Sequence, residues 1–213
     1  MIFNLILADT SRSYMYLKNI IKESILVDNI LIYSNKKFTK LRKLCLKNKL
    51  DFLTIKTKSI NSKIATKKIL SFENKNFIFS GYPGEIVKNE ILLKKNFFHC
   101  HPGKLPEFKG STTIYYALLL KKDIYCSVIK ISDKIDSGEI FYERKFNKPL
   151  NKIEIEKKFD DKIRSITICE FLKKKKFKKI KYKSSKKYLS SYYICHPLLR
   201  QLIIKKGYLN FSL

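Results

Sequence analysis

Strands and helices alternate through the first 80 residues, and this alternation restricts the possible folds more than any other feature of the sequence. Short apolar runs typical of buried strands occur at residues 1–7, 29–33, 51–55 and 76–80. Segments with apolar residues at helical spacing separate these runs, at residues 10–23, 37–49 and 61–70. Alternating strands and helices form β-α-β units with parallel strands. We therefore predict an α/β fold with a Rossmann-like, doubly wound, mostly parallel sheet and helices on both faces.

The rest of the chain continues this pattern and then becomes basic. Strand-like runs occur at residues 96–101, 126–131 and 140–146, and helical patterns cover residues 111–122 and 152–171. A lysine-rich run at residues 173–187 follows, and the last residues are rich in aromatic and apolar side chains. We predict one domain over residues 1–175 and a basic C-terminal extension, residues 176–213, that packs onto it.

The formal net charge is +28, from 46 lysine and arginine residues against 18 aspartate and glutamate residues. A charge of this size attracts nucleic acid, nucleotides and other polyanions. It also has a compositional explanation, because lysine, asparagine and isoleucine are abundant and tryptophan is absent. The lysines are spread along the chain instead of forming one patch, which favours the compositional explanation. Nucleic acid is therefore a possible partner but not the favoured one.

The cysteines and the hydropathy indicate the compartment. The five cysteines are widely spaced and form no C-x-x-C pair, so neither a zinc site nor a disulfide framework is predicted. This pattern fits a reducing compartment. No run approaches about 18 apolar residues, so no membrane-spanning helix is expected. No positive charge precedes the apolar start, which argues against a signal peptide. We therefore expect a cytoplasmic protein.

The glycines of the predicted strand-to-helix turns indicate where a ligand could bind. The turn after the first strand contains none, which argues against the G-x-G-x-x-G fingerprint of dinucleotide-binding enzymes and against a P-loop. Gly81, Pro83 and Gly84 instead follow the fourth predicted strand. Open α/β sheets bind ligands at the carboxyl edge, where this loop is expected to lie. By itself, an ordinary turn is the simpler interpretation of the loop.

Two of the three histidines, His99 and His101, lie two residues apart in the fifth predicted strand, so their side chains share a face. Asp136 follows about 35 residues after His101, in a turn beyond the next strand. If the sheet continues in parallel, both strand ends lie on one edge and Asp136 reaches His101. The pair would serve in general acid–base catalysis or in oxyanion stabilisation. A structural histidine, a metal site of imidazole and carboxylate, and a plain turn at Asp136 also fit.

The segment after Gly110 begins with Ser111, Thr112 and Thr113, which suit the N-terminus of a helix. The free amides of such an N-terminus attract anions, so an anionic ligand is one interpretation. Simple N-capping of the helix explains the same residues equally well.

The order of these residues resembles the folate-dependent formyltransferase family. That family carries N-x-H-P-S-x-L-P-x-x-x-G, a helix, and D-x-G about 35 residues beyond the histidine. Here H-P-G-K-L-P-E-F-K-G occupies residues 101–110 and D-S-G occupies residues 136–138. The resemblance is strong over residues 81–144, whereas residues 1–80 match mainly in the alternation of strands and helices.

The resemblance implies that His101 and Asp136 are catalytic, with His99 beside them, that 10-formyltetrahydrofolate is the formyl donor, and that no metal takes part. An amine would attack the formyl carbon, His101 would stabilise the oxyanion, and Asp136 would help to remove the amine proton. The donor would be bound by two loops that contain Gly81, Tyr82, Pro83, Gly84, Ile86 and Val87, and Ile131, Ser132, Asp133, Lys134 and Ile135. The acceptor would lie near Leu105, Pro106, Gly110, Ser111, Thr112, Thr113 and Tyr115.

Two positions depart from the family pattern. His99 stands where the family has asparagine. An imidazole can still donate a hydrogen bond, so oxyanion stabilisation is expected to be altered or the activity reduced. Gly103 stands where the family has serine, which is expected to change the acceptor side.

The acceptor is predicted by comparing the members of the family. Methionyl-tRNA formyltransferase has a further C-terminal domain that 213 residues do not accommodate. Glycinamide ribonucleotide formyltransferase has a glycine-bearing phosphate loop that is missing here. The sugar N-formyltransferases, which act on nucleotide-linked amino sugars for surface glycans, fit best. We expect a small primary amine of that class as the acceptor. A tRNA-formylating enzyme, a non-catalytic nucleic-acid-binding protein on the same scaffold and a formyltetrahydrofolate hydrolase are the alternatives, and the oligomeric state is left open.

Overall fold

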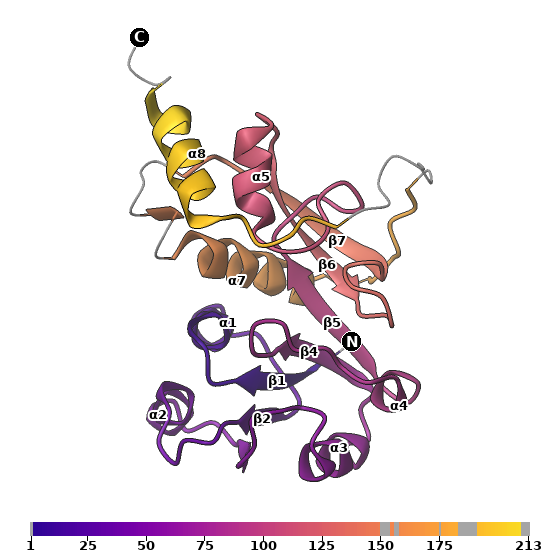
Figure 1. Ribbon diagram of the computed structural model, residues 1–213. Coiled ribbons are helices and arrows are strands. Elements are labelled where there is room, and N and C mark those ends of the chain that lie inside the picture. Colours follow the sequence, from indigo (N-terminus) through magenta and orange to yellow (C-terminus); the bar gives the residue numbers. More distant parts are fainter. Residues whose placement is uncertain (1, 150–153, 156–157, 175, 183–190, 210–213) are drawn as a thin grey trace.

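The computed structural model describes residues 2–149, 154–155, 158–174, 176–182 and 191–209. They contain a seven-stranded sheet in the order β3-β2-β1-β4-β5-β6-β7 (Figure 1). The strands are β1 (Asn4–Ala8), β2 (Ile30–Tyr33), β3 (Leu53–Ile55), β4 (Asn76–Ser80), β5 (Asn96–His101), β6 (Ile124–Lys130) and β7 (Glu139–Phe146). The first five strands run parallel, whereas β6 is antiparallel to β5 and β7 is antiparallel to β6. The predicted Rossmann-like, mostly parallel α/β fold is confirmed.

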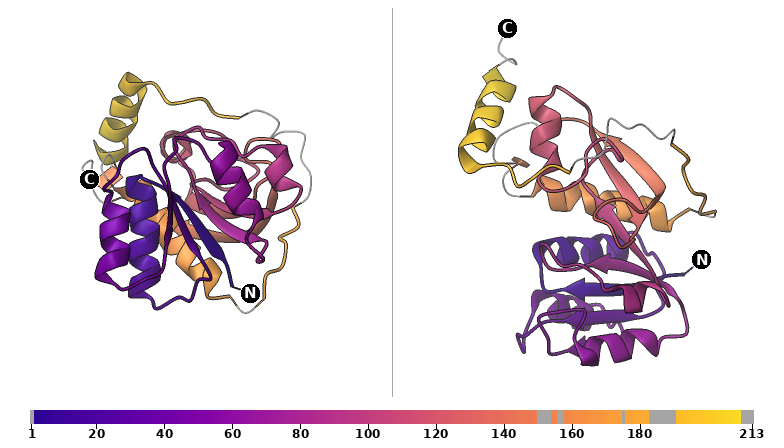
Figure 2. Two further views of the ribbon diagram at one scale, coloured as in Figure 1. Left: turned by 90° about the horizontal axis from the view of Figure 1, so that it is seen from below. Right: turned by 45° about the vertical axis from the view of Figure 1, so that its right-hand side comes forward.

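Helices cover both faces of the sheet because the strands are apolar on both faces. In β1, Leu5 and Leu7 pack into one apolar cluster and Ile6 and Ala8 into the other. The first cluster lies under α1 (Ser11–Lys22), α2 (Lys40–Lys47) and α7 (Phe159–Leu172). The second lies under α3 (Lys63–Leu70) and α4 (Asn89–Leu92). Figure 2 shows the sheet between these two layers of helices.

Three N-caps explain where the first long helices begin. Thr10, Thr39 and Ser62 precede α1, α2 and α3, and each side chain accepts a hydrogen bond from the amide three residues later, at 3.1, 3.1 and 3.3 Å. Such a bond satisfies one of the free amides of a helix N-terminus. The helices therefore begin one to three residues inside the predicted ranges.

The expectation that the sheet continues in parallel beyond β5 is wrong. His101 pairs with Ser127 and Phe98 with Lys130, so β6 runs antiparallel to β5. The intervening helix, α5 (Thr113–Leu119), has seven residues and spans about 10 Å. The six residues of β5 extend over about 20 Å. The connection does not return along the strand, because β6 begins beside the end of β5, with Ser127 opposite His101.

Three helices differ from the predicted pattern. The short helix α4 and the C-terminal helix α8 (Pro197–Leu209) were not predicted. Of the helix expected from residue 152, the structure describes residues 154–155, which are helical, and α7 from Phe159, whereas residues 152–153 and 156–157 lie outside the described residues. The same holds for residues 175 and 183–187 of the lysine-rich run. In the part of the chain that the structure describes, no helix is both long and apolar enough to cross a membrane.

The C-terminal helix α8 (Pro197–Leu209) lies beside α5 (Figure 1). The segment before it forms an isolated parallel bridge between Gly110 and Tyr192. The Tyr192 ring lies between Phe108, with ring centroids 5.6 Å apart, and Tyr116, with centroids 4.5 Å apart. Residues 191–209 therefore contact the part of the chain that follows β5.

Candidate active site

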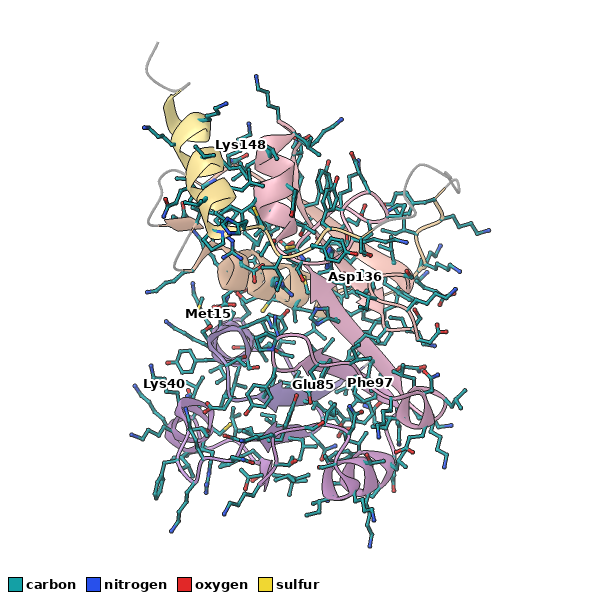
Figure 3. The ribbon with its side chains drawn as sticks, in the orientation of Figure 1. Met15, Lys40, Glu85, Phe97, Asp136 and Lys148 are labelled. Atoms are coloured by element: carbon teal, nitrogen blue, oxygen red, sulfur yellow. The ribbon has the colours of Figure 1, made fainter. Side chains whose placement is uncertain are left out.

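His101 and Asp136, the predicted catalytic pair, are in direct contact. His101 ends β5 and is 2% exposed. Its Nδ1 lies 3.3 Å from Oδ1 of Asp136, and Oδ2 of the same carboxylate accepts a hydrogen bond from the Gly110 amide at 2.8 Å. In Figure 3 Asp136 lies near the arrowhead of β5, whereas Phe97 lies farther back along the strand. The carboxylate is therefore held from two sides and directed at the imidazole.

Asp136 reaches His101 by a route that differs from the predicted one. Lys130, the last residue of β6, pairs with Phe98, three residues before the end of β5. The loop of residues 131–138 therefore has to run back along β5 by about 10 Å. Asp136 has a φ of +48°, in the left-handed region that aspartate tolerates better than most residues. At Gly138 a Cβ would overlap the carbonyl oxygen of Lys130, so the tight return requires glycine there.

The second ring nitrogen of His101 also has a partner. Nε2 lies 2.6 Å from the carbonyl oxygen of Phe108. Carbonyl and carboxylate oxygens only accept hydrogen bonds, so the two contacts together call for hydrogen on both ring nitrogens, which is the charged imidazolium. Gly103 makes the approach possible, because a Cβ there would lie 2.6 Å from Phe108 O and 2.8 Å from His101 Nε2. Glycine in place of serine at position 103 thus leaves room for the contact between His101 Nε2 and the Phe108 carbonyl.

The pKa of Asp136 is low although the residue is largely buried. Burial by itself raises the pKa of a carboxyl group. The hydrogen bond and charge of His101 and the Gly110 amide outweigh this effect and lower the pKa of Asp136 to about 2. Asp136 is therefore ionised at neutral pH.

His99 lies on the same strand face as His101 but has different partners. Its Nδ1 is 3.2 Å from the carbonyl oxygen of Phe79 in β4, and its Nε2 is 3.3 Å from Nη1 of Arg164 in α7. Burial, and after it the positive charges of Arg164 and Arg12, lower the pKa of His99 to about 3. The imidazole of His99 is therefore neutral at physiological pH.

His99 is expected to make the folded state sensitive to mild acid. Its folded pKa is about 3 and its ordinary value is 6.5, so between these values the unfolded chain binds a proton that the folded chain does not. Its contribution to stability is complete above pH 6.5 and is lost as the pH falls toward 3. From pH 6 to pH 4, the free energy of unfolding should fall more steeply in the natural protein than in His99→Asn, by about one proton in slope. Urea titrations of both proteins at several pH values measure this, and equal slopes would contradict it.

Side chains from α1 and β5 bind the end of β4, directly before the loop that is predicted to hold the donor. Three successive carbonyl oxygens accept hydrogen bonds: Phe79 O from His99 Nδ1 at 3.2 Å, Ser80 O from Ser13 Oγ at 3.1 Å and Gly81 O from Arg12 Nη2 at 2.6 Å. Buried carbonyls of this kind require partners. The start of the loop is therefore fixed by residues distant in sequence.

Arg12, Arg164 and Glu85 contact residues of the candidate site and were not among the residues predicted from the sequence. Glu85 accepts hydrogen bonds from the amides of Tyr82 at 3.0 Å and Ile60 at 2.7 Å, and from the Tyr33 hydroxyl. The two arginines could have been noticed in the sequence, because only five of the 46 basic residues are arginine. A planar guanidinium group makes several directed hydrogen bonds, so a rare arginine in a lysine-rich chain marks a candidate site residue. No comparable signal marked Glu85.

The two loops predicted to bind the donor contribute to the same apolar cluster, through Tyr82 and Ile131. Tyr82 packs edge-on against Tyr33, and Gly84 has a φ of +75°. Ile86 and Ile135 are exposed, by 57% and 60%, and Pro83, Asp133 and Lys134 are exposed as well. Val87 is buried in the core, so its side chain has no free surface for a ligand, and Ser132 donates a hydrogen bond to Lys134 O at 3.2 Å.

The residues predicted to bind the acceptor divide into buried and accessible ones. Leu105 packs against Ile129 and Ile140, and the buried Thr113 hydroxyl donates to Pro102 O. Pro106, Gly110, Thr112 and Tyr115 are partly accessible and Ser111 is exposed. Thr112 Oγ1 accepts a hydrogen bond from the Cys195 amide at 2.8 Å, and the Arg200 guanidinium lies 5.3 Å from the Tyr115 ring centre. The C-terminal segment therefore contacts this side of the candidate site.

A separate hollow of about 360 Å³ lies at the carboxyl edge of the sheet, near the ends of β1 and β2. Tyr82 is the predicted site residue among those that line it, and the others are Asp9, Ser34, Asn35, Lys36 and Lys58. Lys36 and Asp9 face each other across 3.7 Å. Within the described ranges, three or more His, Cys, Asp or Glu side chains are nowhere grouped so that they could hold a metal ion.

Solved structures share this fold. Phosphoribosylglycinamide formyltransferase from Streptococcus pneumoniae TIGR4 aligns with a TM-score of 0.61 at 16% identity, over 81% of this chain and 98% of that one. A sugar N-formyltransferase from Shewanella sp FDAARGOS_354 aligns with a TM-score of 0.59 at 14% identity, over 97% and 88%. A formyltetrahydrofolate deformylase from Pseudomonas syringae aligns with a TM-score of 0.60 at 14% identity, over 81% and 60%. The chain has the fold of the folate-dependent formyltransferases.

No protein-family model and no curated protein matches the sequence. The formyltransferase fold is thus recognised through the arrangement of its strands and helices.

Proposed function

We propose that this protein transfers a formyl group from 10-formyltetrahydrofolate to the primary amine of a small acceptor. The observation that carries the proposal is the contact between His101 and Asp136 in a formyltransferase fold. The proposed donor site is formed by the two loops at residues 81–87 and 131–135. The proposed acceptor site lies along residues 105–115.

The proposed reaction uses the charge of this pair. The amine nitrogen attacks the formyl carbon, the new C–N bond forms, and the bond from carbon to N10 of the folate breaks. The imidazolium of His101 stabilises the negative charge that develops on the formyl oxygen. Asp136, ionised at neutral pH, accepts the proton that the amine loses, and N10 takes up one proton as it leaves, so the products are the N-formyl amine and tetrahydrofolate. For the formyl oxygen to take this place, it has to displace the Phe108 carbonyl from His101 Nε2.

A nucleotide-linked amino sugar is the acceptor class that we propose. The alignment with the sugar N-formyltransferase from Shewanella covers 97% of this chain, whereas the alignment with the phosphoribosylglycinamide enzyme covers 81%. The first β-α turn has no glycine that could approach a ribonucleotide phosphate. A cytoplasmic location is consistent with a soluble folate donor and a soluble acceptor.

The proposal is tested by incubating the purified protein with 10-formyltetrahydrofolate and single amines, followed by mass spectrometry. The amines are nucleotide-linked amino sugars, glycinamide ribonucleotide and methionyl-tRNA. We expect an added formyl group on an amino sugar. Formate without a formylated amine would instead identify a hydrolase, which the likeness to the Pseudomonas deformylase makes the second candidate. Salt-dependent tRNA binding without turnover would identify a non-catalytic nucleic-acid-binding protein.

A further inference from the structure

The hydrogen bonds of His99 define which of its nitrogens carries hydrogen. Nδ1 faces the carbonyl oxygen of Phe79 at 3.2 Å, and a carbonyl only accepts, so Nδ1 has to donate. Nε2 faces Nη1 of Arg164 at 3.3 Å, and a guanidinium only donates, so Nε2 has to accept. Both contacts are satisfied together by one species, the neutral imidazole with hydrogen on Nδ1.

This tautomer has a consequence for the chemistry at the strand end. The family's asparagine at this position carries an amide that can donate to a ligand. In His99 the nitrogen that donates is already bound to Phe79 O, and the other nitrogen has a lone pair and no hydrogen. His99 in this arrangement therefore offers no hydrogen-bond donor to a formyl oxygen.

Arg164 is held firmly beside His99. Its side chain is 12% exposed. Nε donates to Asp160 Oδ1 at 2.9 Å, one turn earlier on α7, and Nη1 donates to the Cys100 carbonyl at 2.9 Å. Cys100 lies between His99 and His101, so the guanidinium is bound to the backbone of the strand that carries both histidines.

The charged groups around His99 come from three sides. Arg164, with Asp160 behind it, approaches from α7, Arg12 from α1 and Asp136 from the loop of residues 131–138. Arg12 is itself tied to β4, through Ser80 Oγ at 3.2 Å and Gly81 O at 2.6 Å. Two positive charges thus lie near the imidazole, and the nearest of them contacts it directly.

We propose that Arg164 is a positioning residue that holds His99 as the neutral, Nδ1-protonated tautomer and supplies a fixed positive charge beside it. His99 then serves as the acceptor that orients Arg164 and is not the oxyanion donor that the resemblance implied. The catalytic meaning of this arrangement rests on the proposed formyl transfer, but the tautomer can be measured without any turnover.

The test is nitrogen-15 NMR of the histidine side chains in the full-length protein. The chain has three histidines, so His99→Gln and His196→Gln assign the signals. In the natural protein we expect His99 to be neutral with hydrogen on Nδ1, without titration from pH 5 to pH 8. In Arg164→Met, which keeps the length of the side chain and removes its charge and donors, Nε2 loses its donor, so its nitrogen-15 shift should change and the pKa of the ring should rise. An Nε2-protonated or charged His99 in the natural protein at pH 7 would overturn the proposal.

Arg144→Met is the matched control, because Arg144 also pairs with a carboxylate of α7, that of Glu170. It should leave the His99 signals unchanged. A folded Arg164→Met with unchanged His99 signals would overturn the proposal. Should Arg164→Met not fold, Arg164→Lys decides, because one ammonium group cannot serve Asp160, Cys100 O and His99 together. A shifted tautomer ratio in Arg164→Lys would support the proposal, and an unchanged one would overturn it.

Kinetics separate this inference from the proposed function. Once an acceptor is identified, Arg164→Met should lower kcat by at least about tenfold and leave KM for the folate donor nearly unchanged. An unchanged kcat would contradict a role of Arg164 in catalysis. If the natural protein shows no turnover with any amine, the proposed function fails, whereas the NMR result still decides the tautomer.

Discussion

Asp136→Asn should lower the rate of formyl transfer by at least about 100-fold, and the variant should still fold, with a lower thermal unfolding temperature because a buried charged partner of His101 is lost. Asparagine has the shape of aspartate but no charge, so His101 loses the ionised partner that lies 3.3 Å from its Nδ1. The side-chain amide also brings a donor to a place where the Gly110 amide and the His101 ring both need an acceptor. The imidazolium is then no longer favoured, and the oxyanion loses its stabilising charge.

The measurement is single-turnover formyl transfer to the acceptor found by mass spectrometry. Asp123→Asn is the matched control, because Asp123 is an exposed carboxylate that pairs with Lys145 and lies outside both proposed binding sites. It should retain most of the rate. His101→Gln should lose about as much as Asp136→Asn, and the double variant should lose little more, since the two residues act as one unit. Normal rates in both single variants would show that the pair is not catalytic.

Gly110→Ala should destabilise the protein by about 2 kcal/mol or more and release the C-terminal segment from its site. Gly110 has a φ of +93°, and a Cβ there would overlap the backbone of Tyr192. That backbone cannot move aside easily, because Tyr192 N donates to Lys109 O at 2.8 Å and Tyr192 O accepts from the Ser111 amide at 2.9 Å. The Gly110 amide, which donates to Asp136, lies between these two bonds.

Gly84→Ala is the control that separates steric overlap from the strain of a left-handed backbone. Gly84 also has a positive φ, +75°, but a Cβ there would meet no atom within 4 Å. It should therefore cost only the strain of the left-handed conformation, about 1 kcal/mol. Urea unfolding gives both free energies, and limited proteolysis reports whether residues 191–209 are released. Equal destabilisation by the two variants, without new cleavage, would contradict the role assigned to the contact between Gly110 and Tyr192.

The parallel half of the fold could be predicted because its signals are local. The apolar runs of β1, β2 and β4 are continuous, as buried parallel strands require, and the intervening helices start at Thr10, Thr39 and Ser62 with side-chain caps. The direction of β6 could not be predicted in this way. It depends on how far a seven-residue helix and its loops travel in space, and a hydrophobic pattern contains no such distance.

The sequence by itself determined the layered α/β architecture and marked His101, Asp136 and Gly110 by their spacing, because periodicity and motif order are properties of neighbouring residues. Only the tertiary structure decided how these residues meet. The return of the loop along β5 brings Asp136 to His101, and the Phe108 carbonyl occupies the other nitrogen of that ring. It also decided the state of His99, because a tautomer is set by the partners of both ring nitrogens. Those partners, Phe79 and Arg164, lie 20 and 65 residues away along the chain.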